Sequence, residues 1–217
     1  PPLPFDQVKQ VSTTIVDRNG KLLRAFAMAD GRWRLPATVK DVDPGYLNLL
    51  LNYEDRRFRS HIGVDPLAMG RAALQLVTRG HIVSGGSTIT MQVARLMEPR
   101  QERSVSAKLR QMVRAIQLER KLSKDQILDL YLTLAPFGGN LEGVRAASFA
   151  YFGKEPKRLS LAESALLVAL PQSPETRRLD RHPDVARAAR DRVLARMVDD
   201  GKVSTEDAVQ AKAVLVP

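Results

Sequence analysis

Residues 54–63 read EDRRFRSHIG and lie between two regions of helical sequence. Glu54, Phe58 and His61 are spaced i, i+4 and i+7, so a helix that continues through this stretch places them on one face. A carboxylate beside an aromatic ring and an imidazole can serve as a general base. The same stretch is also compatible with an ordinary surface carboxylate among arginines, and on its own it does not decide between the two.

The sequence around this stretch predicts helices from residue 43 onward. Asp43 and Asp65 each precede a proline, which is typical of a helix start, and Ser123 and Ser160 have the spacing of capping boxes. The predicted helices span residues 44–60, 66–79, 87–97, 105–121, 124–134, 140–152, 160–170, 183–199 and 204–214.

The first 42 residues have a different pattern. Two apolar-rich runs within residues 12–28 are separated by Asn19-Gly20, and both of these residues tolerate positive φ, so we predict a small β-hairpin there. Residues 29–42 read as a connection. We therefore divide the chain into an N-terminal linker and β-hairpin, residues 1–42, and one mainly α domain, residues 43–217.

Composition narrows the class of protein. The chain has 217 residues, 44% of them hydrophobic, which is enough for a packed core. It lacks cysteine and has 3 histidines far apart in sequence, which excludes thiolate chemistry and argues against a structural zinc site. A net charge of +10 suggests an anionic partner: nucleic acid, a membrane surface or a phosphorylated substrate.

No apolar run in the sequence reaches the ~18 residues that a membrane-spanning helix needs. The longest, residues 165–170, stops at Pro171. The chain begins at Pro1 without a methionine or a signal peptide, so we expect a membrane anchor further upstream.

A second stretch, residues 85–92, reads GGSTITMQ. Two glycines followed by hydroxyl residues at a helix start can present backbone N–H groups to a phosphate or a sugar oxygen. A plain turn followed by a helix with a serine cap is also compatible with these residues.

Basic side chains are concentrated between residues 95 and 121. Arginine forks suit phosphate oxygens, although a solvated basic face is the commoner meaning of such a run. The cluster consists of Arg95, Arg100, Arg103, Lys108, Arg110, Arg114, Arg120 and Lys121.

Taken in order, these blocks resemble the family 51 glycosyltransferases, the polymerase module of class A penicillin-binding proteins. Residues 54–63 match the family's E-D-x-x-F-x-x-H-x-G pattern, and residues 85–92 match G-G-S-T-I-T-x-Q. Residues 123–132 match S-K-x-x-I-L-x-x-Y-L, and residues 159–174 match its closing L-S-L-A-E and L-P-Q-x-P block. Thr90-Met91-Gln92, where the family usually reads T-Q-Q, resembles the 1C-type members.

The resemblance implies a mainly α, lysozyme-like glycosyltransferase fold. It implies a reaction between two lipid-linked substrates. The acceptor is lipid II, and the donor is a glycan chain on undecaprenyl diphosphate. The reaction inverts the anomeric centre of the donor sugar. Glu54 then becomes the general base, and a divalent cation, Mg or Mn, is expected to take part, with Asp55 as its nearest ligand candidate. The residues expected to contact substrate are Asp55, Phe58, His61, Gly86, Ser87, Thr88, Gln92, Arg95, Arg103, Lys108 and Arg110.

One position departs from the family pattern. The family's R-K-x-x-E stretch carries a second glutamate, which aligns with Gln111. A glutamine can hydrogen-bond but cannot carry charge or move a proton, so we assign Gln111 to the catalytic site with a changed role.

A lipid-linked substrate implies a membrane-facing site. The segment between residues 67 and 83 is where the family places a membrane-dipping region, and it carries Leu67, Met69, Leu74, Leu76, Val77, Ile82 and Val83. A buried core helix explains the same residues. The expected location is the outer, periplasmic face of the bacterial inner membrane, with a transpeptidase-type domain fused downstream.

Two further hypotheses remain open at this stage. A lysozyme-like hydrolase would cut finished peptidoglycan, but the basic cluster and the missing second acid argue against it. A scaffold without catalytic activity would use the +10 charge only for binding. With 5% aromatic residues and no nucleic-acid motif, we expect no nucleic-acid partner.

Overall fold

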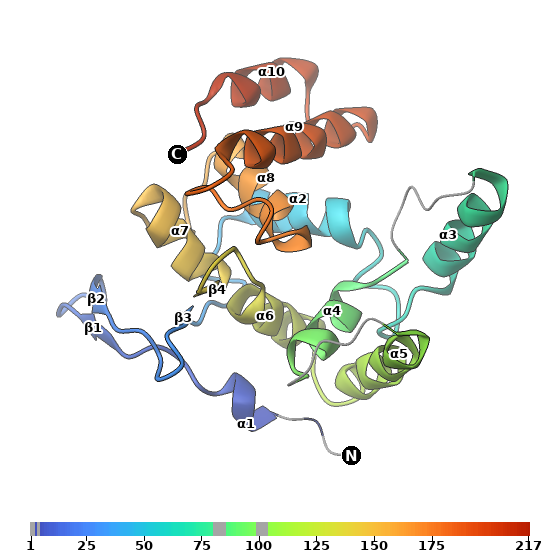
Figure 1. The fold of residues 1–217 in the computed structure, drawn as a ribbon, viewed down its shortest axis with the longest axis horizontal. Helices are drawn as coiled ribbons and strands as arrows, with labels where there is room; N and C mark the ends of the chain where they lie inside the picture. Colours follow the sequence, from blue (N-terminus) through green and yellow to red (C-terminus); the bar gives the residue numbers. More distant parts are fainter. Residues whose placement is uncertain (1–2, 4, 80–85, 99–103) are drawn as a thin grey trace.

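The computed structural model describes residues 3, 5–79, 86–98 and 104–217, and most of these residues are helical (Figure 1). The predicted mainly α class is therefore confirmed. The helices are α1 (Phe5–Val8), α2 (Pro44–Glu54), α3 (Pro66–Arg79), α4 (Ile89–Leu96), α5 (Val105–Glu119), α6 (Lys124–Leu134), α7 (Val144–Phe152), α8 (Leu161–Ala169), the 3-10 helix η1 (Leu170–Gln172), α9 (Pro183–Asp199) and α10 (Thr205–Ala213). The strands are β1 (Thr14–Val16), β2 (Leu22–Ala25), β3 (Trp33–Arg34) and β4 (Leu141–Glu142).

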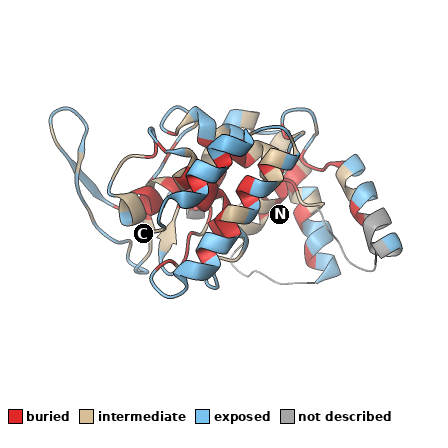
Figure 2. Cartoon of the chain, turned by 90° about the horizontal axis from the view of Figure 1, so that it is seen from above, coloured by how far each residue is buried: buried red, intermediate tan, exposed pale blue. Residues whose placement is uncertain are grey.

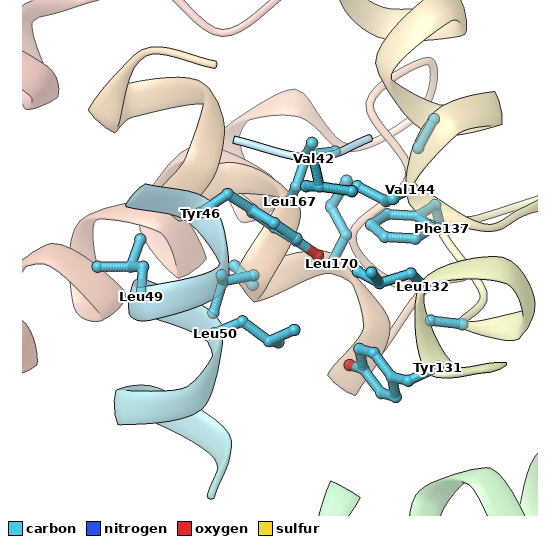
Figure 3. Close-up of a cluster of buried hydrophobic side chains, with 14 of the residues drawn as sticks. Val42, Tyr46, Leu49, Leu50, Tyr131, Leu132, Phe137, Val144, Leu167 and Leu170 are labelled. Carbon is cyan, nitrogen blue, oxygen red and sulfur yellow. The ribbon is translucent and has the colours of Figure 1, made fainter. Parts of the chain in front are cut away.

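Helix α8 forms the centre of the core. Its sequence, LAESALLVA, is apolar on nearly every side, as expected for a helix enclosed by others, and it packs against α2, α9 and α10. Figure 3 shows Leu167 and Leu170 in one cluster with Tyr46 and Leu50 of α2 and with Phe137. Figure 2 shows the same buried interior enclosed by exposed helix faces.

The helix starts follow the local signals in the sequence. Ser123 and Ser160 both form complete capping boxes, with Gln126 and Glu163 as their partners. Asp43 caps α2, where its side chain accepts hydrogen bonds from the backbone N–H groups of residues 45 and 46. These predictions are confirmed because each depends only on residues within one turn.

The predicted helix over residues 44–60 is wrong at its end. Helix α2 stops at Glu54, and Asp55 leaves the helical conformation with φ −158° and ψ 75°. Residues 56–63 form turns instead, and Gly63 takes a positive φ of 92°. Glu54, Phe58 and His61 are therefore not on one helix face.

The predicted helix over residues 140–152 begins four residues late, at Val144. Residues 141–142 form β4, which pairs in parallel with β3, and this small sheet was not predicted. Gly143 has a φ of 86°, and a Cβ there would lie 2.7 Å from the carbonyl oxygen of Thr133, so the backbone turns tightly before α7.

The N-terminal hairpin is confirmed. Strands β1 and β2 pair antiparallel, and the hairpin projects from the end of the molecule opposite α3 and α5 in both views (Figures 1 and 2). Only Gly20 of the Asn-Gly pair takes a positive φ, at 79°. Asn19 keeps a negative φ, because its N–H donates to the side chain of Asp17, as does the N–H of Lys21. Within the described residues, no helix is long and apolar enough to cross a bilayer.

Candidate active site

Glu54 lies where three elements meet. It is the last residue of α2, and its side chain is half-buried. Gln92 of α4 donates a hydrogen bond from Nε2 to Oε2 of Glu54 at 3.0 Å, and Gln172 of η1 donates to Oε1 at 2.7 Å. Each carboxylate oxygen thus receives one neutral N–H donor, which fixes the carboxylate in place without neutralising its charge.

Asp55, the next residue, has a structural role. One of its oxygens accepts the N–H of Ile89 at 2.9 Å, and both lie 3.0 Å from Nε2 of His61. The Nδ1 atom of His61 accepts the N–H of Gly63, so the ring proton is on Nε2 and is donated to Asp55. This buried pair joins the end of α2 to the start of α4.

Phe58 is 1% exposed and belongs to the core rather than to an open surface. The ammonium group of Lys124 lies 4.7 Å from the centre of its ring and donates to the backbone oxygen of His61. Lys124 also pairs with Glu119 at 2.7 Å, and Glu119 accepts the hydroxyl of Thr90. Side chains from α4, α5 and α6 therefore stabilise the turn that follows α2.

The hydroxyl groups of Ser87 and Thr88, at the start of α4, form hydrogen bonds within the protein. Thr88 caps the helix by accepting the N–H of Met91 and donates its own hydroxyl to Gly63 at 2.6 Å. The N–H of Ile89 donates to Asp55, so this backbone N–H is not available to a bound anion. Ser87 accepts a hydrogen bond from Lys108, and Gly86 lies against Met69 of α3.

Arg95 lies one turn after Gln92 on the same helix. Burial, and then the negative charge of Glu54, raise the pKa of Tyr131, whereas the positive charge of Arg95 opposes this shift. The charges of Glu54 and Arg95 both affect the pKa of Tyr131, so the two side chains lie in the same region of the molecule. The Nε atom of Arg95 is buried and makes no hydrogen bond in the part of the chain that the structure describes. A buried donor without a partner calls for an explanation, and a bound ligand or a partner outside the described residues would provide one.

The other predicted basic residues extend from Arg95 along α5. Burial and the charge of Arg95 lower the pKa of Lys108, which shows that these two cations are close. Arg110 and Arg114 flank the buried carboxylate of Glu98 at 3.5 and 3.4 Å. Arg103 and Arg100 lie outside the described residues.

Gln111 is buried on α5, 7% exposed. Its helix packs against α4, which carries Gln92 and Arg95. The structure therefore buries an uncharged amide on α5 at the position where the family pattern has an acid.

Gln172 was not predicted as a site residue. It lies in the L-P-Q block, which was recognised only as a family pattern, and its contact with Glu54 spans 118 residues of sequence. The amide oxygen of Gln172 accepts a hydrogen bond from Arg177 at 3.2 Å. No local signal in the sequence indicates this contact.

Asp55 does not fit the predicted metal ligand. Its oxygens are already in contact with Ile89 and His61. Across the described residues, no three acidic or histidine side chains group closely enough to hold a metal ion. The participation of a divalent cation stays a prediction.

A cavity of about 530 Å³ lies elsewhere, between the N-terminal segment and the end of α4. Its charged lining consists of Arg32, Arg34, Glu98 and Glu142. Glu142 pairs with both arginines, so this lining is mostly neutralised within the protein. Neither Glu54 nor Gln92 lines the cavity, which separates it from the site described above.

Comparison with known proteins identifies the family of the chain. The model of a family described as transglycosylase matches residues 19–198. The chain belongs to the transglycosylase family. It is 50% identical to penicillin-binding protein 1C of Escherichia coli over 97% of the chain, and 35% identical to penicillin-binding protein 1F of Bacillus subtilis over 94%.

A crystal structure of penicillin-binding protein 1A from Haemophilus influenzae has the same fold, with a TM-score of 0.52 and 20% identity over 96% of this chain. The prediction of a family 51 glycosyltransferase with resemblance to 1C-type members is therefore confirmed. This transglycosylase chain spans 27% and 28% of the length of the two relatives, and 22% of the solved chain.

Proposed function

We propose that this transglycosylase domain polymerises lipid II into β-1,4 glycan strands, with Glu54 as the general base. The observation that carries the proposal is the pair of amide hydrogen bonds on a half-buried carboxylate, one of them from Gln92, which lies one helical turn before Arg95 on α4. The arrangement combines a proton acceptor with a positive charge nearby, which are the two requirements for transfer from a diphosphate donor.

The proposed step balances as follows. The 4-hydroxyl of the acceptor sugar gives its proton to Glu54 while its oxygen bonds to C1 of the donor sugar. The bond between C1 and the diphosphate oxygen breaks, and the leaving undecaprenyl diphosphate keeps the electron pair. Attack from the face opposite the leaving group inverts the anomeric centre.

The leaving diphosphate requires positive charge. Arg95 offers a buried guanidinium N–H that has no hydrogen-bond partner among the described residues, and Lys108 adds a second cation close by. Burial, and then the positive charge of Arg95, lower the pKa of Lys108, and a bound diphosphate would offset the repulsion between the two cations. We assign Arg95 and Lys108 to the diphosphate and leave Arg103 as a prediction.

A membrane-facing surface is supported by α5. Val105, Leu109 and Val113 follow each other at i, i+4 and i+8 and are 80%, 58% and 56% exposed. The opposite face of α5 is the buried one, so this helix has apolar residues on two sides. Lys108 and Arg110 border the exposed stripe, an arrangement that suits lipid tails beside anionic headgroups.

Leu67 of α3 is also exposed, and helix α3 lies at the same end of the molecule as α5 (Figure 1). The side chains of the other residues predicted to dip into the membrane, apart from Met69, lie outside the described residues. We place the domain at the periplasmic face of the inner membrane. There it would be anchored by an upstream segment and followed by a transpeptidase-type domain.

A polymerisation assay tests this proposal. The chain is incubated with fluorescent lipid II, with and without moenomycin, and the products are separated by gel electrophoresis. We expect glycan polymer from the native chain, none with moenomycin, and none from Glu54→Gln. Full polymerisation by Glu54→Gln would exclude Glu54 as the base.

Gln111 favours one alternative function, a scaffold with little catalytic activity. An amide occupies the position where the family pattern has a second acid, and it cannot move a proton. If the native chain binds lipid II without polymerising it, and Gln111→Glu restores polymer, the scaffold is the better description.

A further inference from the structure

We propose that Arg177 is a positioning residue that acts through Gln172 to hold the Glu54 carboxylate in its catalytic orientation. This inference rests on the proposed role of Glu54 as the base. It concerns two residues that lie more than 110 positions after Glu54 in the sequence and that the family resemblance does not assign.

The Gln172 side chain needs an external partner to be held in place. Gln172 ends the short helix η1, and its side chain is exposed, so packing does not fix the amide. An exposed glutamine amide can turn over and exchange its oxygen and nitrogen. With the oxygen toward Glu54, two acceptors would face each other and the contact would be repulsive.

Arg177 removes this ambiguity. Its Nη1 atom donates to Oε1 of Gln172 at 3.2 Å and also to the backbone oxygen of Ala169, at the end of α8. A guanidinium has only donors, so the amide oxygen of Gln172 must face Arg177 and its NH₂ group must face Glu54. The 2.7 Å contact from Gln172 to Glu54 follows from this orientation.

Arg177 is itself held among charged neighbours. Burial, and then the positive charge of Arg192, lower the pKa of Arg177, whereas Tyr53 and Glu54 oppose the shift. Its contact with Ala169 ties the guanidinium to the most buried helix of the fold. The chain Ala169–Arg177–Gln172–Glu54 thus connects the rigid core to the proposed base.

The two glutamines that contact Glu54 differ in how they are supported. Gln92 lies within α4, a regular helix whose start is fixed by Thr88 and Asp55. Gln172 lies at the end of a three-residue helix and has Arg177 as its partner. Loss of Arg177 should therefore release one side of the carboxylate and leave the other side bound.

A matched pair of Gln172 variants tests the donor. Gln172→Glu has the same shape but replaces the NH₂ donor by an acceptor, so we expect kcat to fall about 100-fold with a smaller change in KM. We also expect the acid limb of the rate profile to move to higher pH, because a second carboxylate disfavours ionisation next to it. Gln172→Ala removes the donor without adding a charge, so kcat should fall about 10-fold while the acid limb stays at the native pH.

A double-mutant cycle separates positioning from folding. Arg177→Ala should lower kcat about 10-fold in the native background, but have little further effect in Gln172→Ala, because no amide is left to orient. If Arg177 only supports the fold through Ala169, the loss will be equal in both backgrounds, and the proposal fails. Arg181→Ala, an exposed arginine on the same segment, serves as the control.

A measurement without substrate keeps this inference separate from the proposed function. Hydrogen exchange of the Gln172 side-chain amide, followed by NMR, should be slower in the native chain than in Arg177→Ala. Unchanged exchange would overturn the positioning role even if the chain polymerises lipid II. If Glu54→Gln polymerises normally while exchange responds to Arg177, the proposed function fails but the Arg177–Gln172 contact stands.

Discussion

The Nε2 atom of His61 lies 3.0 Å from both carboxylate oxygens of Asp55, and one of these oxygens also accepts the N–H of Ile89. This pair connects the first family pattern to the second. Removal of the carboxylate in Asp55→Ala leaves a buried imidazole N–H and a buried helix N–H without acceptors.

We therefore expect Asp55→Ala to lower the free energy of unfolding by about 3 kcal/mol, measured by urea denaturation. Asp180→Ala, at an exposed aspartate, should leave the midpoint nearly unchanged and serves as the control. A metal-ligand role predicts a different result, in which Mn²⁺ stabilises the native chain and Asp55→Ala matters only when the metal is present.

Gly63 should not tolerate a side chain. Its φ is 92°, and a Cβ would lie 2.7 Å from the backbone of Ala115 on α5. Gly63→Ala should therefore cost about 3 kcal/mol or more, from backbone strain and displacement of α5 together. Gly153→Ala is the matched control, because Gly153 has a φ of 67° with nothing within 4 Å, and it should cost only about 1 kcal/mol. Equal losses would contradict the close approach to α5.

Arg95 should matter for the reaction far more than for folding. Its buried Nε has no hydrogen-bond partner in the described part of the chain, so Arg95→Ala breaks no internal hydrogen bond at that atom. We expect kcat/KM for lipid II to fall about 10²- to 10³-fold with little change in melting temperature, and Arg95→Lys to retain part of the activity. Arg120→Ala, at an exposed arginine, should polymerise normally. A large loss of stability in Arg95→Ala would show that the guanidinium is structural.

Lys108 links stability to pH in a defined direction. A lysine whose pKa is lower in the folded chain than in the unfolded chain destabilises the fold while it is charged. This cost is present at neutral pH and disappears as the pH rises through 10.5, the ordinary lysine value. Lys108→Met should therefore unfold at higher urea than the native chain at pH 7, with the difference fading near pH 10.5. The same variant should polymerise more slowly, because one of the cations for the diphosphate is lost. If Lys108→Met is less stable than the native chain at pH 7, the charge of Lys108 stabilises the fold and this prediction is wrong.

The exposed stripe on α5 should bind lipid. Replacement of Leu109 and Val113 by serine should weaken binding to vesicles that contain anionic lipid, measured by co-sedimentation, without changing the melting temperature. Val209→Ser, at an exposed valine on α10, is the control. Unaltered sedimentation of the α5 variant would remove the support that this helix gives to a membrane-facing surface.

The parts of the fold that the sequence predicts well depend on local interactions. The capping boxes at Ser123 and Ser160 and the hairpin turn at Gly20 each involve residues within a few positions of one another. The end of α2 is different, because Asp55 leaves the helix to accept the N–H of Ile89, 34 positions away. The helical pattern in residues 55–60 is real, but this tertiary contact overrides it.

In the candidate site too, the sequence indicates the residues within recognised patterns but not the contacts between distant segments. Glu54, Gln92 and Arg95 were predicted from ordered family patterns, and the structure brings them together. Gln172 contacts Glu54 across 118 positions, and Arg177 acts through Gln172, so no local periodicity indicates either. Phe58 and His61 belong to the same pattern as Glu54 but face the interior, because a shared motif does not separate residues that react from residues that support them.

The two amides on Glu54 have a consequence for inhibitor chemistry. Both carboxylate oxygens already receive an N–H donor, so an incoming sugar hydroxyl has to compete with a glutamine for one of them. A small molecule that presents two parallel N–H groups, such as an amidine or a urea, would replace both glutamines at once. Its affinity should report directly on how firmly the protein holds its own donors.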